Sequence, residues 1–241
     1  MLRVEYTGGL VSPSVTVGRL PLVSVYADGR VISEGPMIAI HPAPALPNLQ
    51  EHRIDAPAVQ DLVDRALAAG VGDRSDLGSP PIADAPSTRV TLVTASHTYV
   101  REAYALTGTP DDTDGLTAEQ HAARKELSGL VDVLTGTTAD GDTTGYVPSS
   151  VAALVRPWTD PQDGLVQPDA AWPGPALPGE PAGGLFDLTC VTATGDQAQA
   201  LLTAAGSANA DTPWVTADGN RWTVTFRPLL PDESSCADLQ D

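Results

Sequence analysis

Basic residues and aromatic side chains are scarce in this chain. Lys and Arg together number 13 against 31 Asp and Glu among 241 residues, so the formal net charge is −18, and Lys125 is the sole lysine. Proteins that bind nucleic acid or anionic lipid present clustered Lys and Arg. The charge balance therefore argues against a nucleic-acid partner. The acid excess either attracts cations or a basic partner, or it is a solvated surface without a ligand.

Long hydrophobic runs are also missing. No apolar run approaches the roughly 18 residues that a membrane span requires, and the first residues, MLRVEYTGG, lack the basic and apolar regions of a signal peptide. The sequence thus predicts a soluble chain without a membrane span. Met1 is also compatible with a start placed after a removed export signal.

Cysteine occurs only twice, as Cys190 and Cys236. The two residues lack metal-site spacing; one ends a predicted strand and the other lies in the C-terminal tail. We predict a disulfide that fixes the tail to the sheet, contributing about 4 kcal/mol in the chain-entropy model and implying an oxidising compartment. The alternative is two unpaired thiols, one buried and one in the tail.

Motifs of known catalytic sites are absent. The sequence has no GxSxG, no phosphate-binding glycine loop and no GxGxxG after a strand. The four histidines lack the i, i+4 or HxH spacing of a local metal site, so each is predicted to be a surface histidine: His41, His52, His97 and His121. A dispersed triad or carboxylate pair is left open, since such groups converge only in the fold. No cofactor is expected apart from a possible calcium ion.

The clearest local pattern is a hairpin within Leu20–Ser33. Strands Leu22–Tyr26 and Arg30–Ser33 flank an Asp-Gly pair, for which we predict a tight primed turn with positive φ at Gly29. A lone hairpin cannot bury its face, so further elements must cover it. Strand-forming composition predicts seven more strands: Leu2–Tyr6, Arg89–Thr94, Tyr99–Leu106, Val151–Val155, Leu185–Thr192, Trp214–Thr216 and Arg221–Arg227.

Three helices carry start and stop signals. The first runs from Asp55 to Gly70, the second from a capping box at Thr117 to Gly136, and the third from Asp196 to Gly206. Each has an apolar stripe; the residues expected to face inward are Val59, Leu62, Val63, Ala66, Leu67, Leu127, Leu130, Val131, Leu134, Ala198, Leu201, Leu202 and Ala205. We predict an α+β fold: an antiparallel sheet built from hairpins with about three packed helices.

A proline-rich segment covers residues 156–184. Its seven prolines exclude a helix or a central strand. It is either a linker or a belt laid across one domain, and Trp158 and Trp172 favour the belt because a free linker has little use for large apolar anchors. We therefore predict a single domain, 1–241, with 156–184 as a belt. The alternative is two subdomains, 1–155 and 185–241.

An acidic loop precedes the second helix. Asp111, Asp112 and Asp114 surround Gly115, with Glu119 just beyond. Calcium takes six to eight oxygens from a tightly turning backbone, so these four acids are candidate ligands, although the spacing is not that of an EF-hand. The alternative is that they interact with the helix dipole.

The four tryptophans lie in the C-terminal half. On predicted strands, Trp214 and Trp222 are expected to be buried. In the proline-rich segment, Trp158 and Trp172 are either core residues or ligand contacts that stack on sugar rings or anchor a peptide.

Three stretches carry a family resemblance: YTGG at 6–9, LPLVSVYADGRVI at 20–32 and RPLLPDESSC at 227–236. Together they resemble a group of uncharacterised secreted proteins or lipoproteins of actinobacteria. The resemblance implies an exported, extracellular or envelope-attached protein whose signal segment is absent here. It transfers no catalytic residue.

Two functions remain open on these grounds. The first is a non-catalytic envelope module that binds a protein, peptide or glycan. The second is a hydrolase that acts on envelope material through carboxylates or a dispersed triad.

Overall fold

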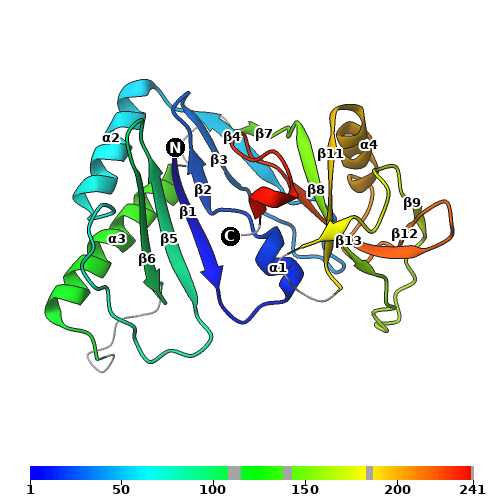
Figure 1. Ribbon diagram of the computed structural model, residues 1–241, viewed down its shortest axis with the longest axis horizontal. Coiled ribbons are helices and arrows are strands. Elements are labelled where there is room, and N and C mark those ends of the chain that lie inside the picture. Colours follow the sequence, from blue (N-terminus) through cyan, green and yellow to red (C-terminus); the bar gives the residue numbers. More distant parts are fainter. Residues whose placement is uncertain (108–114, 138–142, 183–186, 240–241) are drawn as a thin grey trace. The chain divides into compact units, whose positions relative to one another are not determined.

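The computed structural model describes residues 1–107, 115–137, 143–182 and 187–239. These residues group into two compact units (Figure 1). Unit 1 comprises Met1–Val11, Leu20–Gly35 and Leu49–Tyr146, and unit 2 comprises Ser12–Arg19, Pro36–Asn48 and Val147–Asp241. The chain therefore passes between the units several times. Folding as one domain, and the alternative division at residues 155 and 185, stay predictions.

Unit 1 is an antiparallel sheet with two helices on one face (Figure 1). The strand order is β6-β5-β1-β2-β3-β4-β7. The strands are β1 (Leu2–Gly8), β2 (Val23–Val25), β3 (Arg30–Glu34), β4 (Leu49–Arg53), β5 (Pro86–Val93), β6 (Thr98–Tyr104) and β7 (Thr144–Gly145), and the helices are α2 (Ala56–Ala68) and α3 (Ala118–Gly136).

The core of unit 1 lies between the sheet and these helices. Leu2 pairs with Val25 on one side and Leu92 on the other, which places a row of apolar side chains on the covered face. The helices contribute the predicted stripes, since Leu62, Ala66, Leu127, Leu130, Val131 and Leu134 are all buried. Leu67 is exposed, contrary to prediction, because it lies at the margin of the apolar stripe, in the last turn of α2.

Both helix starts form as the sequence predicts. The Asp55 carboxylate accepts a hydrogen bond from the Ala58 N–H at 2.9 Å. At α3, the Gln120 N–H donates to the Thr117 hydroxyl and the Thr117 N–H donates to the Gln120 side chain, which completes the capping box.

The turn of the predicted hairpin differs in type. Tyr26 bonds to both Gly29 and Arg30, so three residues form the loop, and only Gly29 has positive φ (+85°). This is a type I turn followed by a glycine bulge rather than the predicted primed turn. Two constraints require glycine at position 29. The backbone has positive φ there, and a Cβ would collide with the Ile54 carbonyl oxygen.

Unit 2 contains a second sheet, which the sequence did not separate from the first. Its strand order is β10-β11-β8-β13-β12-β9, antiparallel except for the parallel pair β12–β9. The elements are α1 (Pro13–Gly18), β8 (Ser150–Pro157), β9 (Ala170–Ala171), β10 (Glu180–Pro181), β11 (Thr189–Thr194), α4 (Gly195–Ala205), β12 (Trp214–Val215), β13 (Arg221–Pro228) and a 3-10 helix, Cys236–Leu239.

Strand β8 lies inside this sheet and is buried on both faces. Val151, Ala153 and Val155 pack in a cluster with α4, Trp214 and Phe226. The intervening Ala152 and Leu154 pack in a second cluster with Val17 of α1 and the disulfide half Cys190. A continuous apolar run is therefore required here, as in other strands covered on both sides.

The proline-rich segment supplies both edges of this sheet. Its strands β9 and β10 are two residues long and pair with β12 and β11 respectively. Very short edge strands, with Pro181 in one of them, offer few free backbone groups to another chain. The segment therefore blocks edge-to-edge association at both sides of the unit 2 sheet.

Some predicted boundaries needed correction. The N-cap of α4 is Thr194, and Asp196 lies in the first turn, because β11 continues directly into the helix. Strand β11 begins at Thr189 rather than Leu185, and residues 185 and 186 lie outside the described part. Strand β4 and helix α1 were not predicted, because they are short and lack a clear apolar period.

Candidate functional site

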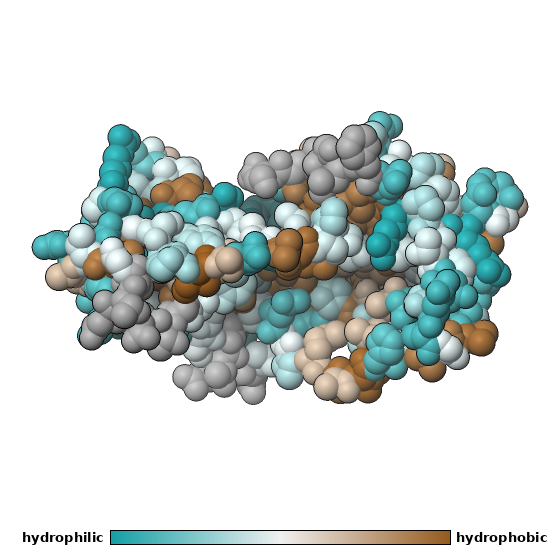
Figure 2. All heavy atoms as spheres, turned by 90° about the horizontal axis from the view of Figure 1, so that it is seen from below, coloured by the Kyte–Doolittle hydropathy of each residue, from teal (hydrophilic) through white to brown (hydrophobic). Residues whose placement is uncertain are grey.

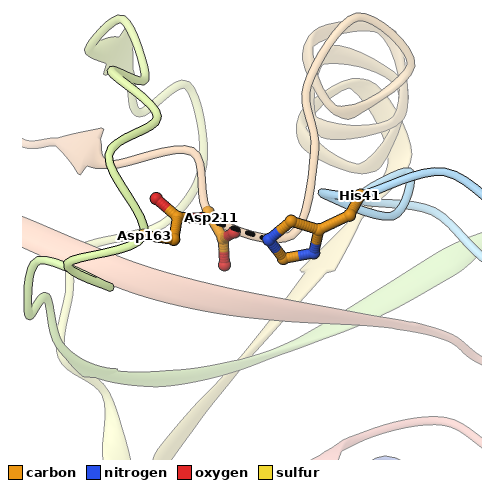
Figure 3. Close-up of side chains that lie close together, drawn as sticks. All are labelled: His41, Asp163 and Asp211. Atoms are coloured by element: carbon orange, nitrogen blue, oxygen red, sulfur yellow. Dashed lines mark hydrogen bonds and ion pairs between the residues drawn. The ribbon is translucent and has the colours of Figure 1, made fainter.

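Two loops of unit 2 meet at an ion pair. His41, in the segment that follows Pro36, places its Nε2 atom 3.0 Å from the Asp163 carboxylate (Figure 3). The other oxygen of Asp163 accepts the Leu165 N–H at 2.9 Å. The pKa of Asp163 is lowered, chiefly by this backbone hydrogen bond and next by the bond to His41. The carboxylate is thus held in its charged form and in one orientation.

Asp211 completes the cluster from a third segment. One ligand atom from each of His41, Asp163 and Asp211 can be chosen so that all lie within 4.8 Å of one another. The view along the site shows the imidazole directed at the two carboxyl groups (Figure 3). No other group of three or more metal-ligating side chains meets this condition within the described ranges.

Backbone pairing holds the three segments together. The Ala210 N–H donates to the Ala43 carbonyl at 2.8 Å, which fixes the chain beside His41 to the chain beside Asp211. The Asn209 amide donates to the Gln167 side chain at 2.7 Å, which ties the same turn to the loop of Asp163. The cluster is therefore assembled by a small network of hydrogen bonds around residues 208–212.

Exposed aliphatic side chains flank the ion pair on both loops. The exposed fractions are 44% for Met37, 65% for Ile38, 55% for Ile40, 46% for Leu165 and 94% for Val166. We call these five residues the loop patch. Figure 2 shows brown hydrophobic side chains among teal hydrophilic ones on the face drawn. All five lie within four residues of His41 or Asp163 along the chain, and contiguous exposed apolar patches are typical of binding surfaces.

The candidate tryptophans take different positions. Trp172 packs edge-on against Trp214 and stacks on Phe226, so it belongs to the core cluster of unit 2. Trp158 is half-buried, and the Arg221 guanidinium lies 5.5 Å from its ring centroid. The predicted burial of Trp214 is confirmed, while Trp222 is only partly buried. Both candidate ligand-contact rings are thus partly covered by neighbouring side chains of unit 2.

The predicted calcium ligands fall mostly outside the described residues. This holds for Asp111, Asp112 and Asp114. Glu119 is exposed in the first turn of α3, and its pKa is lowered by a bond from its own backbone N–H and by the Thr117 hydroxyl. That environment matches the helix-start alternative for Glu119, and the calcium site stays a prediction.

The histidine prediction was correct for His41 and His97 and wrong for His52. His41 and His97 are exposed, whereas His52 is 6% exposed on β4. Burial occurs because His52 pairs with Val31 and shares its face of the sheet.

The His41 cluster could not be found from sequence spacing. Its members stand at positions 41, 163 and 211 and come together only in the folded chain.

The predicted disulfide is present. Cys190 in β11 bonds to Cys236, 46 residues later, at the start of the 3-10 helix. Beside it, the buried Arg227 guanidinium forms an ion pair with Glu233 at 2.8 Å. The C-terminal segment is thus attached to the sheet by one covalent and one ionic contact.

Unit 1 has a separate apolar groove of about 580 Å³ at the start of α2. Its walls include Val25, Val59, Leu62, Val63 and Val93. Polar side chains are few in this lining, which suits an apolar group better than a reaction that moves protons.

Comparison with known proteins found no match. No family model, no curated protein and no solved structure is similar to this chain at a significant level. Among the described residues, no helix has both the length and the apolar composition needed to cross a bilayer.

Proposed function

We propose that this protein is a non-catalytic binding module of the cell envelope or the extracellular space, and that the loop patch of unit 2 docks a protein or peptide partner. The observation that carries the proposal is the exposure of five aliphatic side chains on two loops joined by the His41–Asp163 pair. Burying them is favourable by roughly 25 cal/mol per Å² of apolar area removed from water.

The chemistry of the patch favours a protein over a glycan. Sugar rings stack on aromatic faces, whereas the exposed residues here are aliphatic, and Trp172 packs in the core. The acidic balance of the chain favours a basic partner, because opposite charge speeds encounter. The disulfide supports an oxidising location, in which such bonds persist.

Support for the hydrolase alternative is weaker. Within the described residues, the side-chain hydrogen bond of His41 goes to Asp163, and none goes to a serine, threonine or cysteine. Nucleophilic catalysis needs a hydroxyl or thiol within hydrogen-bond reach of its base. The His41 cluster therefore lacks the nucleophile that such a reaction requires.

Site-specific photo-crosslinking tests the docking proposal. A photoreactive residue is placed at Ile38 or Val166, and the protein is incubated with envelope and secreted fractions of its source. Val100, which is 53% exposed on β6 of unit 1, is the matched control position. We expect one shared product at positions 38 and 166 and none at 100, and loss of that product from position 38 when Val166→Ser and Ile40→Ser are combined. Equal labelling at all three positions, or none, contradicts the proposal.

A further inference from the structure

We propose that His41, Asp163 and Asp211 form a binding site for a divalent transition-metal ion, with zinc as the best fit. The inference goes beyond the docking proposal and does not depend on it, because it concerns the coordinating side chains rather than the loop patch.

The donor types fit zinc. Imidazole nitrogen and carboxylate oxygen are both common zinc ligands, with bonds of about 2.0–2.2 Å. Calcium and magnesium prefer oxygen alone, so the nitrogen of His41 selects for a transition metal. Donors bound to one tetrahedral ion lie about 3–3.5 Å apart, as bond lengths of that size require. His41 and Asp163 are already 3.0 Å apart, and a ligand atom of Asp211 lies within 4.8 Å of both.

Charge also favours a cation at this position. With a neutral imidazole, the cluster carries the two negative charges of Asp163 and Asp211, which lie close enough to repel each other. A divalent ion cancels both charges. Without a metal, one oxygen of Asp163 is hydrogen-bonded to His41 Nε2 at 3.0 Å. A bound ion would replace that contact.

Pre-organisation reduces the cost of binding. The bond from the Ala210 N–H to Ala43 and the bond between Asn209 and Gln167 hold the three segments close before any ion arrives. The Leu165 N–H occupies one oxygen of Asp163 and leaves the other directed at His41. Groups that are already ordered lose little conformational entropy when they bind a ligand.

Three protein donors leave at least one coordination position open. In zinc proteins such a position holds water or an incoming ligand. Because His41 is exposed at the surface, the open position faces solvent and is accessible to a side chain of another molecule.

Metal titration of the full-length protein, without a histidine tag, tests this inference. The protein is treated with a chelator and then titrated with Zn²⁺ by calorimetry at pH 7.5, with Co²⁺ absorption as a report of coordination geometry. We expect one zinc ion per chain at this site, a d–d absorption band for cobalt and a rise in Tm with zinc, since a ligand of the native state stabilises it. Calcium should compete poorly.

Substitutions locate the ion. We expect His41→Ala and Asp211→Asn each to weaken zinc binding at least tenfold, while His97→Ala, which removes an exposed histidine of unit 1, leaves it unchanged. Each variant should retain the Tm of the parent protein without metal, because His41 is exposed and Asp211 is only partly buried. The proposal is overturned if zinc does not bind in a saturable manner, if His41→Ala and Asp211→Asn bind as tightly as the parent, or if calcium binds equally well.

Discussion

At the scale of single residues, the buried His52 is expected to make the stability of unit 1 depend on pH. His52 is buried on β4, and its Nε2 atom has no hydrogen-bond partner among the described residues. Burial lowers the pKa of His52 in the folded state below the value of about 6.5 for an unfolded chain. The folded state thus favours the neutral ring, and the unfolded state binds more protons once the pH falls below that value.

We expect the free energy of unfolding to be unaffected by His52 above about pH 6.5 and to fall as the pH drops below it toward the folded pKa. Urea denaturation at pH 7.5 and pH 5.5 measures the change. Carboxylates titrate mostly below pH 5.5, so they contribute little to the difference between these two pH values. In His52→Gln the loss between the two pH values should shrink, whereas in His97→Gln it should match the parent. An equal loss in the parent and in His52→Gln contradicts the assignment.

The buried ion pair of unit 2 is a second feature at the scale of residues. Arg227 and Glu233 have side chains only 2% and 5% exposed. Removing one partner leaves a buried charge unpaired, so we expect Glu233→Gln to lower the free energy of unfolding by about 3–5 kcal/mol. The double variant Arg227→Met with Glu233→Leu should recover most of that loss. Chemical denaturation of the single and double variants decides this; a double variant as unstable as Glu233→Gln would mean that packing, rather than charge, dominates.

At the scale of elements, local signals determined the helices. Asp55 and Thr117 both act as predicted, because capping depends only on residues three positions apart. Strand β4 was missed for the opposite reason: only Leu49 and His52 of its five residues are buried, and pairing with β3 sets its structure. The loop of Asp28 and Gly29 was located correctly, but its packing against Ile54, whose N–H donates to the Gly29 carbonyl, could not be read from sequence spacing.

The N-cap of α2 allows a test at this scale. We expect Asp55→Ala to lower the free energy of unfolding by about 0.5–2 kcal/mol, because the Ala58 N–H loses its partner. Asp55→Asn should retain most of the stability, since an amide oxygen also accepts that bond. Asp64→Ala, on the exposed face of the same helix, is the matched control, and thermal denaturation followed by circular dichroism compares the three. An Asp55→Ala loss no larger than that of Asp64→Ala would contradict the capping role.

At the scale of the whole molecule, α+β composition was predictable but the separation into two sheets was not. Each hairpin signal is local, whereas membership of a sheet depends on long-range pairing such as that of β8 with β11 and β13. The same limit applies to the candidate site, whose three donors come from distant segments. The disulfide was predictable because the chain has only two cysteines, so only one pairing is possible within the chain.

The disulfide yields a prediction for unit 2. Its removal in Cys190→Ser with Cys236→Ser should lower the free energy of unfolding by about 4 kcal/mol, as the chain-entropy model gives for a loop of this size. Denaturant melts and amide hydrogen exchange measure the effect, and exchange should quicken in β8, β11 and β13. The parent protein under strong reductant should behave like the double variant. A parent that keeps its full stability under strong reductant, with both thiols shown to be free, would show that the bond adds nothing.

The position of the disulfide also orders the events of biogenesis. Cys190 lies in β11, and every strand of the unit 2 sheet precedes Cys236 along the chain. During synthesis, Cys190 therefore cannot pair with Cys236 until β12 and β13, which lie between the two cysteines, have been translated. The native bond therefore cannot form until the whole sequence of the unit 2 sheet has been synthesised.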